Sequence, residues 1–493
     1  MEQRKAGILM HISSLPGKYG IGTMGKSAYD FVDYLKASKQ TLWQVLPIGP
    51  TSYGDSPYQN ASVYAYNPYF IDFDLLQEDG LLNKSDYESV DFGSDPLRID
   101  YAKLFLTKEK VLRKAYSKRI LVENSFKKFS KDNAYWLDDY ALFSVIKNHN
   151  NNQAWNTWDD KYRLRDAKAL SSFKSKFQKE IDEVKFIQFL FKNQWDKLKD
   201  YANKNGIEII GDMPIYVAYD SADTWANPEL FELDSNLTPI NVAGCPPDKF
   251  AVDGQLWGNP IYNWEFMKKD KYTWWVSRLK ASLELYDIVR IDHFRGFSGY
   301  YSIPFSDTTA RNGVWVPGPG MNLFNELNKA VPHANIIAEN LGFIDEDTEK
   351  LLEDSGYPGM IIGQFEMANK VTEPFKQGFP VNNVIYTGTH DNQTINSWFE
   401  ELPLTDREYV EKECMFNLSY RPNLKIIERV FHTAPKWVVI PWQDYLGLKD
   451  SEGRMNIPST LGGNWVYRAK KSDFRKDISD FMKKITEESN RLG

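Results

Sequence analysis

Eight short apolar segments recur along the 493-residue chain, and they limit the possible folds more than any other feature. Each is bounded by turn residues, and helical patterns separate most of them. Apolar strands that alternate with helices are typical of an α/β protein with a parallel sheet covered on both faces. The segments are residues 7–12, 42–47, 207–212, 286–292, 335–340, 360–365, 383–389 and 436–442. Eight such strands favour a closed (β/α)8 TIM barrel over an open doubly wound sheet.

The spacing of these segments is uneven, which predicts insertions. Residues 48–206 separate the second segment from the third, far more than one crossover needs. Residues 77–180 are rich in lysine and helical in pattern, so we expect an inserted helical subdomain there. Residues 213–285 read as a second, loop-rich insertion that covers the active site. We expect a single catalytic barrel, residues 1–493, that carries both insertions.

Charge and cysteine content exclude several classes of protein. The formal net charge of −7 and the isoelectric point near 5.6 argue against nucleic-acid binding, which needs a basic surface. Two cysteines are too few for a disulfide framework and fit a reducing cytoplasm. No apolar stretch is long enough for a membrane helix, and the N-terminal apolar run is too short for a signal peptide. We therefore expect a cytoplasmic protein.

Aromatic residues make up 15% of the chain, and many stand beside Gly, Pro, Asn and Asp, as in residues 51–70. Rings on loops suit sugar ligands, although packing of these loops over the core explains them equally well. Residues 20–25, GIGTMG, match the glycine pattern of a dinucleotide site. Seven residues separate them from the first strand, and the second strand lacks a terminal acid, so we interpret them as a structural turn.

Acidic residues follow four of the apolar segments. They are Asp212, Asp292, Glu339 and Asp391. In a barrel, the C-terminal ends of the strands form the active face. Any one of these acids, taken singly, fits a structural ion pair as well as a functional role, but four on one rim favour function. A magnesium site is one alternative, but no phosphate-binding glycine loop accompanies the acids, and the six histidines show no metal-ligand spacing.

Glycoside cleavage fits these carboxylates better, because it needs one carboxylate nucleophile and one carboxylic acid, about 5 to 5.5 Å apart in retaining enzymes. Arg290 and Asp292 are two apart on a strand and share a face, so the guanidinium favours the ionised carboxylate. Glu339 follows an apolar run with no cationic neighbour in sequence, and desolvation would raise its pKa as a general acid requires. Asp391 is left to bind sugar hydroxyls. His293 and His390 would donate hydrogen bonds to the sugar, unless they are packing residues.

Longer motifs carry a family resemblance. They include GILMHISSLPGKYGIGTMG, WQVLPIGPTSYGDSPYQNASVYAYNPYFID, GDMPIYVAYDSADTWANPELF, GQLWGNPIYNW, VRIDHFRGF, IIAENLG, YTGTHDN, RMNIPST and GNWVYR. The chain resembles the bacterial and plastid 4-α-glucanotransferases (amylomaltases, or disproportionating enzymes), relatives of the α-amylases. The resemblance covers nearly the whole length and implies an enzyme with no cofactor and no metal that acts on malto-oligosaccharides and other α-1,4-glucans.

The resemblance also implies a role for each residue that matches a motif. Asp292 would be the nucleophile, Glu339 the acid/base, and Asp391 the stabiliser of the transition state. The substrate-binding residues would be Tyr58, Asp212, Gln255, Trp257, Arg290, His293, His390 and Asn456. Among these, Tyr58 would stack on the sugar at the cleavage point, Gln255 and Trp257 would line the acceptor side, and Asn456 would meet the donor chain.

Three positions depart from the family pattern. Asn340 stands where an aspartate is usual, and loss of that charge would lower the pKa of Glu339 and shift the pH optimum downward. Lys249 replaces an aromatic residue in a loop that resembles a lid, which would loosen acceptor binding. Ser459 replaces a glycine in a turn.

The leading hypothesis is an enzyme that cleaves an α-1,4-glucan, holds the donor covalently on Asp292 and passes it to the 4-hydroxyl of another glucan. A hydrolase that passes the same intermediate to water is the nearest alternative, because both share the first half of the reaction. A glucan-binding protein without catalysis is the third, although all three catalytic carboxylates are present. The sequence shows no coiled coil or extra association domain that would indicate an oligomer.

Overall fold

Eight parallel strands form the central sheet of the computed structural model, which describes residues 3–247, 251–342, 344–416 and 421–493. The strands are β1 (Lys5–Leu9), β2 (Leu42–Gln44), β3 (Glu208–Met213), β6 (Ile288–Ile291), β9 (Ile336–Ala338), β10 (Gly359–Ile362), β11 (Asn383–Tyr386) and β12 (Trp437–Pro441). Their order in the sheet is β10-β11-β12-β1-β2-β3-β6-β9. The Ala338 amide donates to the Pro358 carbonyl at 2.9 Å and brings β9 against the start of β10. The predicted strands and the (β/α)8 barrel are confirmed.

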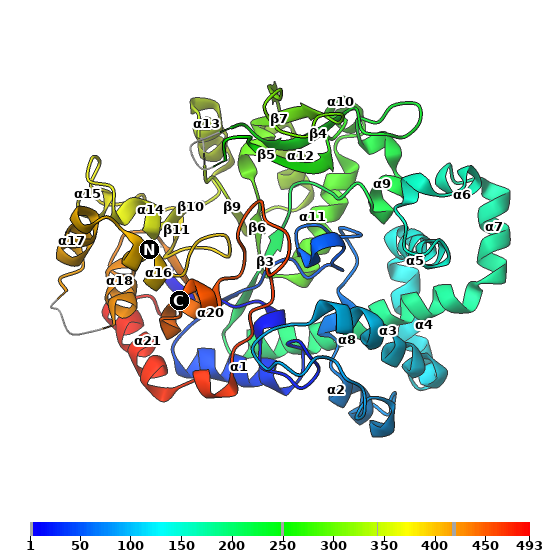
Figure 1. The fold of residues 1–493 in the computed structure, drawn as a ribbon, viewed down its shortest axis with the longest axis horizontal. Coiled ribbons are helices and arrows are strands. Elements are labelled where there is room, and N and C mark those ends of the chain that lie inside the picture. The colour runs from blue at the N-terminus through cyan, green and yellow to red at the C-terminus, as the bar shows by residue number, and fades with distance from the viewer. Residues whose placement is uncertain (1–2, 248–250, 343, 417–420) are drawn as a thin grey trace.

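Helices follow most barrel strands and cover the outside of the sheet (Figure 1). They are α1 (Lys26–Ala37) after β1, α12 (Met321–Ala330) after β6, α13 (Glu346–Ser355) after β9, α14 (Gly363–Met367) and α15 (Pro374–Gln377) after β10, α16 (Ile395–Glu401), α17 (Leu404–Glu413) and α18 (Pro422–Phe431) after β11, and α19 (Trp442–Leu446), α20 (Asp450–Gly453) and α21 (Lys476–Glu488) after β12. Local sequence sets their ends. In α13, Asp345 accepts a hydrogen bond from the Thr348 amide at the N-terminus, and Gly356 takes the left-handed conformation after the last turn.

A group of helices fills the long connection between β2 and β3 and lies at the right of Figure 1. They are α2 (Phe73–Glu78), α3 (Tyr101–Ala115), α4 (Glu123–Asp132), α5 (Ala134–His149), α6 (Asp160–Arg163), α7 (Ala167–Lys176) and α8 (Gln178–Lys204). Buried apolar residues of this group belong to the same core cluster as the barrel strands. The helical region therefore shares one continuous apolar core with the barrel; the boundaries 77–180 and 213–285 of the two insertions stay predictions.

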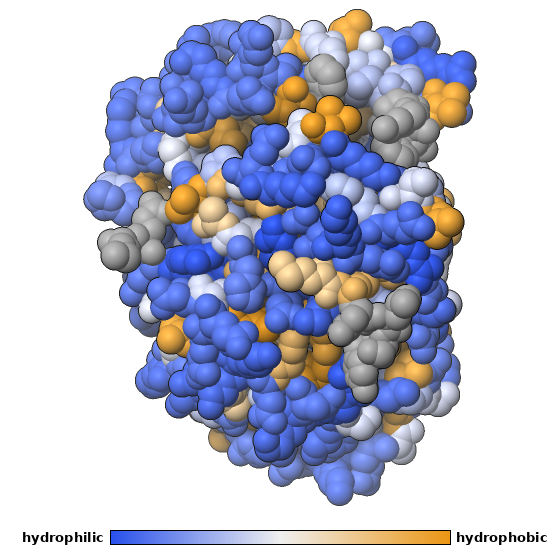
Figure 2. All heavy atoms as spheres, turned by 90° about the vertical axis from the view of Figure 1, so that its left-hand side faces the viewer, coloured by the Kyte–Doolittle hydropathy of each residue, from blue (hydrophilic) through white to orange (hydrophobic). Residues whose placement is uncertain are grey.

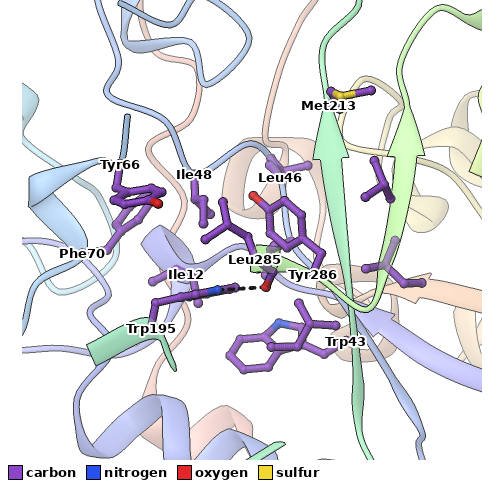
Figure 3. Packing of buried hydrophobic residues seen from close by; sticks show 14 of the residues in the cluster. Ile12, Trp43, Leu46, Ile48, Tyr66, Phe70, Trp195, Met213, Leu285 and Tyr286 are labelled. Atoms are coloured by element: carbon purple, nitrogen blue, oxygen red, sulfur yellow. Dashed lines mark hydrogen bonds between the residues drawn. The ribbon is translucent and has the colours of Figure 1, made fainter. Parts of the chain in front are cut away.

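The longest helix, α8, is tied to the barrel by a buried tryptophan. The indole of Trp195 donates to the carbonyl of Leu285 at 2.9 Å, close to Trp43 and Tyr286 (Figure 3). Both tryptophans are fully buried. Replacement of such a side chain by alanine typically costs about 3 to 5 kcal/mol. This contact fixes the helical region against the strands that carry the candidate site.

A second sheet lies beside the barrel, at the top of Figure 1. It is antiparallel, in the order β5-β4-β7-β8, and contains β4 (Asn241–Cys245), β5 (Gln255–Pro260), β7 (Gly299–Pro304) and β8 (Val314–Pro317). The connection between β3 and β6 contains β4 and β5 and also α9 (Ala222–Ala226), α10 (Trp264–Lys269) and α11 (Thr273–Leu285). The segment 213–285, expected to be rich in loops, also contains β4 and β5: β5 pairs with β4, and β4 pairs with β7 from beyond β6.

The face seen in Figure 2 is mainly hydrophilic, with apolar residues in small, separate groups. In the described part of the chain, no helix has both the length and the apolar character needed to cross a bilayer.

Candidate active site

A cleft of about 560 Å³ opens at the C-terminal ends of the barrel strands, beside the second sheet. The predicted site residues that line it are Tyr58, Gln255, Trp257, Asp292, His293, Glu339, His390, Asp391 and Asn456. The two remaining predicted residues, Asp212 and Arg290, are buried and contact the lining residues by hydrogen bonds. The structure therefore brings all the predicted site residues together, although they come from segments spread over most of the chain.

Arg290 is shared between two carboxylates. Strand pairing sets Asp212 of β3 directly opposite Arg290 of β6. The Nη1 atom of Arg290 lies 2.7 and 2.8 Å from the two carboxylate oxygens of Asp212 and 3.0 Å from Oδ1 of Asp292. Burial opposes the charge of Arg290, but Asp212 and Asp292 hold its pKa well above the usual value. A guanidinium that is always charged is thus fixed beneath the carboxylate of Asp292, whose side chain is 26% exposed to the cleft.

Glu339 is held by two backbone amides. Its Oε2 accepts from the His293 amide at 2.6 Å, and its Oε1 accepts from the Leu341 amide at 2.9 Å. Burial raises the pKa of Glu339 to about 7, and the nearby charge of Asp292 adds to this rise while Arg290 opposes it. The predicted rise in this pKa is confirmed. At neutral pH the carboxyl therefore populates both the acidic form and the basic form, as a group that must act first as an acid and then as a base requires.

His293 connects these two carboxyls. It follows Asp292 directly and has a left-handed backbone with φ of 50°, which turns its amide toward Glu339. Its ring meets the ring of Trp257 edge-on with centroids 4.9 Å apart, and burial lowers the pKa of His293 to about 4. The neutral imidazole can donate to or accept from a sugar hydroxyl.

Asp391 lines the cleft and pairs with His390. Its Oδ1 accepts from the side-chain amide of Asn456 at 2.7 Å, and its Oδ2 lies 3.4 Å from Nε2 of His390. Burial favours the neutral acid, but the charge of His390 and these hydrogen bonds lower the pKa of Asp391 to about 2. Asp391 is therefore an ionised acceptor throughout the neutral range, and Asn456 orients it.

Aromatic rings form much of the remaining lining. The hydroxyl of Tyr58 donates to Asp212 at 2.8 Å, and its ring stacks on His390 at 4.9 Å. On β5, the indole of Trp257 donates to the side chain of Gln255 at 3.1 Å, as alternate residues of one strand face can do. Trp465 also lines the cleft, 5.9 Å from the ring of Tyr58. Trp465 was not among the predicted site residues, although it lies in the motif GNWVYR.

Arg295, beyond the nucleophile candidate, ties two loops together. Its guanidinium donates to the Gly299 carbonyl at 2.9 Å and to Asp345 at 2.6 Å, and lies 3.6 Å over the ring of Trp315. Asp345 begins α13, which follows Glu339 in the chain. Arg295 therefore fixes the loop after Asp292 against the loop after Glu339.

We expect Arg295→Lys to lower kcat about 10- to 100-fold while KM for maltotriose changes little. Lysine keeps the positive charge but lacks the planar guanidinium that binds both the Gly299 carbonyl and Asp345. Small displacements of the reacting groups then lower the rate. Initial transfer rates measure kcat and KM, and a thermal melt measures any change in stability. The matched control is Arg311→Lys, because Arg311 pairs with Asp253 on the surface. A variant that melts earlier but keeps its kcat would show that Arg295 supports stability alone.

The structure describes two of the three departures from the family pattern. The side chain of Asn340 accepts from the Met360 amide at 2.7 Å and so caps the start of β10. Ser459 has φ of 62°, a left-handed conformation that glycine adopts more easily. Lys249 lies outside the described residues, so its effect on acceptor binding stays a prediction.

Comparisons with known proteins identify the family of the chain. The sequence model of the family described as 4-alpha-glucanotransferase matches residues 10–473. The chain belongs to the 4-alpha-glucanotransferase family. It is 46% identical over 482 residues to a 4-alpha-glucanotransferase of Clostridium butyricum, covering 97% of this chain and 99% of the relative. It is 47% identical over 492 residues to one of Streptococcus pneumoniae, covering 99% and 97%.

A solved structure within the 4-alpha-glucanotransferase family shares the fold in detail. The amylomaltase of Streptococcus agalactiae, solved in complex with acarbose, superposes with a TM-score of 0.96 at 42% identity, covering 99% of this chain and 100% of that chain. The amylomaltase of Corynebacterium glutamicum has a TM-score of 0.77 at 16% identity, covering 99% of this chain and 75% of that chain, which indicates a shared fold.

Proposed function

We propose that the cleft transfers a segment of an α-1,4-glucan to the 4-hydroxyl of another glucan or of glucose, with retention of configuration. The observation that carries this proposal is the pairing of two different carboxyls in one cleft. Asp292 lies on a buried guanidinium, whereas Glu339, with a pKa of about 7, accepts from the amide next to Asp292. A retaining enzyme needs one carboxylate and one acid close together. The family supplies the substrate class, because its relatives are named for glucan transfer.

In the first step, a carboxylate oxygen of Asp292 attacks the anomeric carbon while Glu339 donates its proton to the glycosidic oxygen. The bond to the leaving glucan breaks, and a β-glucosyl ester forms on Asp292. Asp391 accepts hydrogen bonds from sugar hydroxyls, which tighten as the ring flattens in the transition state. The ring of Tyr58 supports the sugar at the cleavage point.

In the second step, Glu339 removes the proton from the acceptor hydroxyl, and the acceptor oxygen attacks the same anomeric carbon. The ester bond to Asp292 breaks and an α-linkage forms. Gln255 and Trp257, joined by their hydrogen bond on β5, hold the acceptor. Transfer prevails over hydrolysis when an acceptor sugar occupies this side of the cleft and excludes water.

Incubation with maltotriose tests the proposed function. We expect glucose and longer oligosaccharides with little net gain in reducing ends, because each bond broken is replaced by a new one. Chromatography of the products and a reducing-end assay distinguish this from hydrolysis. A steady rise in reducing ends would favour the hydrolase, and an absence of products would contradict catalysis.

A cytoplasmic location is part of the proposal. It is supported by the low cysteine content, since two cysteines are too few for a disulfide framework.

A further inference from the structure

A second groove, of about 300 Å³, lies between the start of α5 and the helices α10 and α11. Three separate segments form it: residues 62–64, the first turns of α5, and residues 222–277. In Figure 1, α5 lies at the right and α11 near the centre, with α9 above them. The helices α5 and α9 pack against each other. We call this feature the α5–α11 groove.

Aromatic rings stand at the rim of the α5–α11 groove. Tyr135 is 58% exposed and Phe266 is 38% exposed. Trp274 is partly buried in the wall. Tyr64 is buried and meets the Tyr135 ring edge-on at 5.5 Å, so it holds that ring in place. Fixed rings with an open face are suited to flat, weakly polar ligand surfaces such as the C–H face of a pyranose.

Besides uncharged polar residues such as Asn227 and Ser277, the α5–α11 groove is lined by acidic side chains. They are Asp139, Asp223, Glu229 and Asp270, and no Lys, Arg or His stands among its lining residues in the described chain. Asp223 is buried at the base, where its Oδ2 accepts from the Val63 amide at 2.9 Å. Asp139 pairs with Arg165, which does not line the groove. Carboxylates accept hydrogen bonds from hydroxyl groups, and an acidic lining repels anionic ligands.

This combination of open rings and carboxylate acceptors is also that of the catalytic cleft, where Tyr58, Trp257 and Trp465 accompany Asp292 and Asp391. We propose that the α5–α11 groove is a second binding site for an α-1,4-glucan chain, separate from the site of cleavage. The inference rests on the proposed function, since it takes the substrate class from there. A neutral, polyhydroxylated chain fits the rings and the carboxylates together.

The position of the groove suggests what such binding does. Gln59 lines the catalytic cleft and Ser62 lines the groove, so their Cα atoms are at most about 11 Å apart along the chain. A long glucan held in the groove raises the effective concentration of its own chain at the cleft. A trisaccharide that fills the cleft has no further sugar to place in the groove. The groove therefore favours long glucans over short ones.

The test combines Tyr135→Ala with Phe266→Ala, two exposed rings whose loss leaves the core intact. With amylose as donor and glucose as acceptor, we expect KM to rise about tenfold, since each ring contact contributes a factor of about 2 to 10. We expect kcat, and both constants for maltotriose, to stay unchanged. The matched control is Phe105→Ala, which removes an exposed ring of α3 that does not line the groove.

Three outcomes would overturn the inference. These are an unchanged KM for amylose, an equal rise for maltotriose, and the same rise in the Phe105→Ala control. Retardation of the protein in amylose-containing native gels gives a direct readout, which the double substitution should weaken. Because a glucan is uncharged, this retardation should persist in about 0.3 M NaCl, where the Debye length is below 10 Å. Failure of the proposed function is distinct, because the unaltered protein would then either hydrolyse maltotriose with a rise in reducing ends or not convert it at all.

Discussion

Asp292→Asn is expected to lower the rate of maltotriose disproportionation about 10⁴-fold or more while the fold is retained. The amide of asparagine is a poor nucleophile, and the loss of a catalytic nucleophile removes most of the rate. The fold should persist because the shapes are alike and because Arg290 keeps both of its hydrogen bonds to Asp212. The buried guanidinium is therefore not left without a counter-charge. Initial rates and a thermal melt, measured on the same preparation, check both parts.

The matched control is Asp253→Asn. Asp253 also lines the cleft, but it pairs with Arg311 at the surface. We expect this variant to keep most of its activity. If Asp292→Asn retained more than about one hundredth of the rate, which exceeds the activity that remains after loss of a nucleophile, the assignment of Asp292 would be wrong.

Glu339→Gln is expected to lower the rate about 10² to 10⁴-fold, the range that general acid and base catalysis contributes. The loss should depend on the leaving group. Fluoride leaves from a donor such as maltosyl fluoride without protonation, so the first step, measured as the initial burst of fluoride release, should slow much less than the first step with maltotriose. Equal losses for both donors would contradict the role of Glu339 as the acid.

The pH profile gives a second readout for Glu339. With a pKa of about 7, the carboxyl is protonated below this pH and loses its proton above it. Because the first step needs the protonated form, the rate should fall on the alkaline side of about pH 7, and this limb should be absent in Glu339→Gln. The glutamine can accept from only one of the two amides that bind Glu339, so a stability loss of about 1 to 3 kcal/mol is expected as well.

The local sequence pattern was sufficient to predict the barrel and the acidic residues at the C-terminal ends of its strands. Each barrel strand is a short apolar run, and the acids directly after Ile291 and Ala338 lie at the active end because parallel strands all end on one side. The pairing of Arg290 with Asp292 also follows from spacing alone, since residues two apart on a strand share a face.

Contacts between distant segments could not be predicted in the same way. Asp212 lies opposite Arg290 because of the register between β3 and β6, which no local pattern specifies. The second sheet pairs β4 with β7 across the whole of α10, α11 and β6. The bond from Asn456 to Asp391 joins segments that are 65 positions apart. Each of these depends on tertiary packing, which sets sheet register and loop contacts.

In the proposed reaction, the net charge around Arg290, which two acids share, does not change. When the glucosyl ester forms, Asp292 gives up its negative charge, and in the same step Glu339 gains one by giving up its proton. The total charge around the guanidinium is the same before and after, with Asp212 as the constant partner. No ion has to enter or leave the cleft to accompany the chemistry. The covalent state can therefore persist until a sugar acceptor arrives without a change in the charge of the cleft.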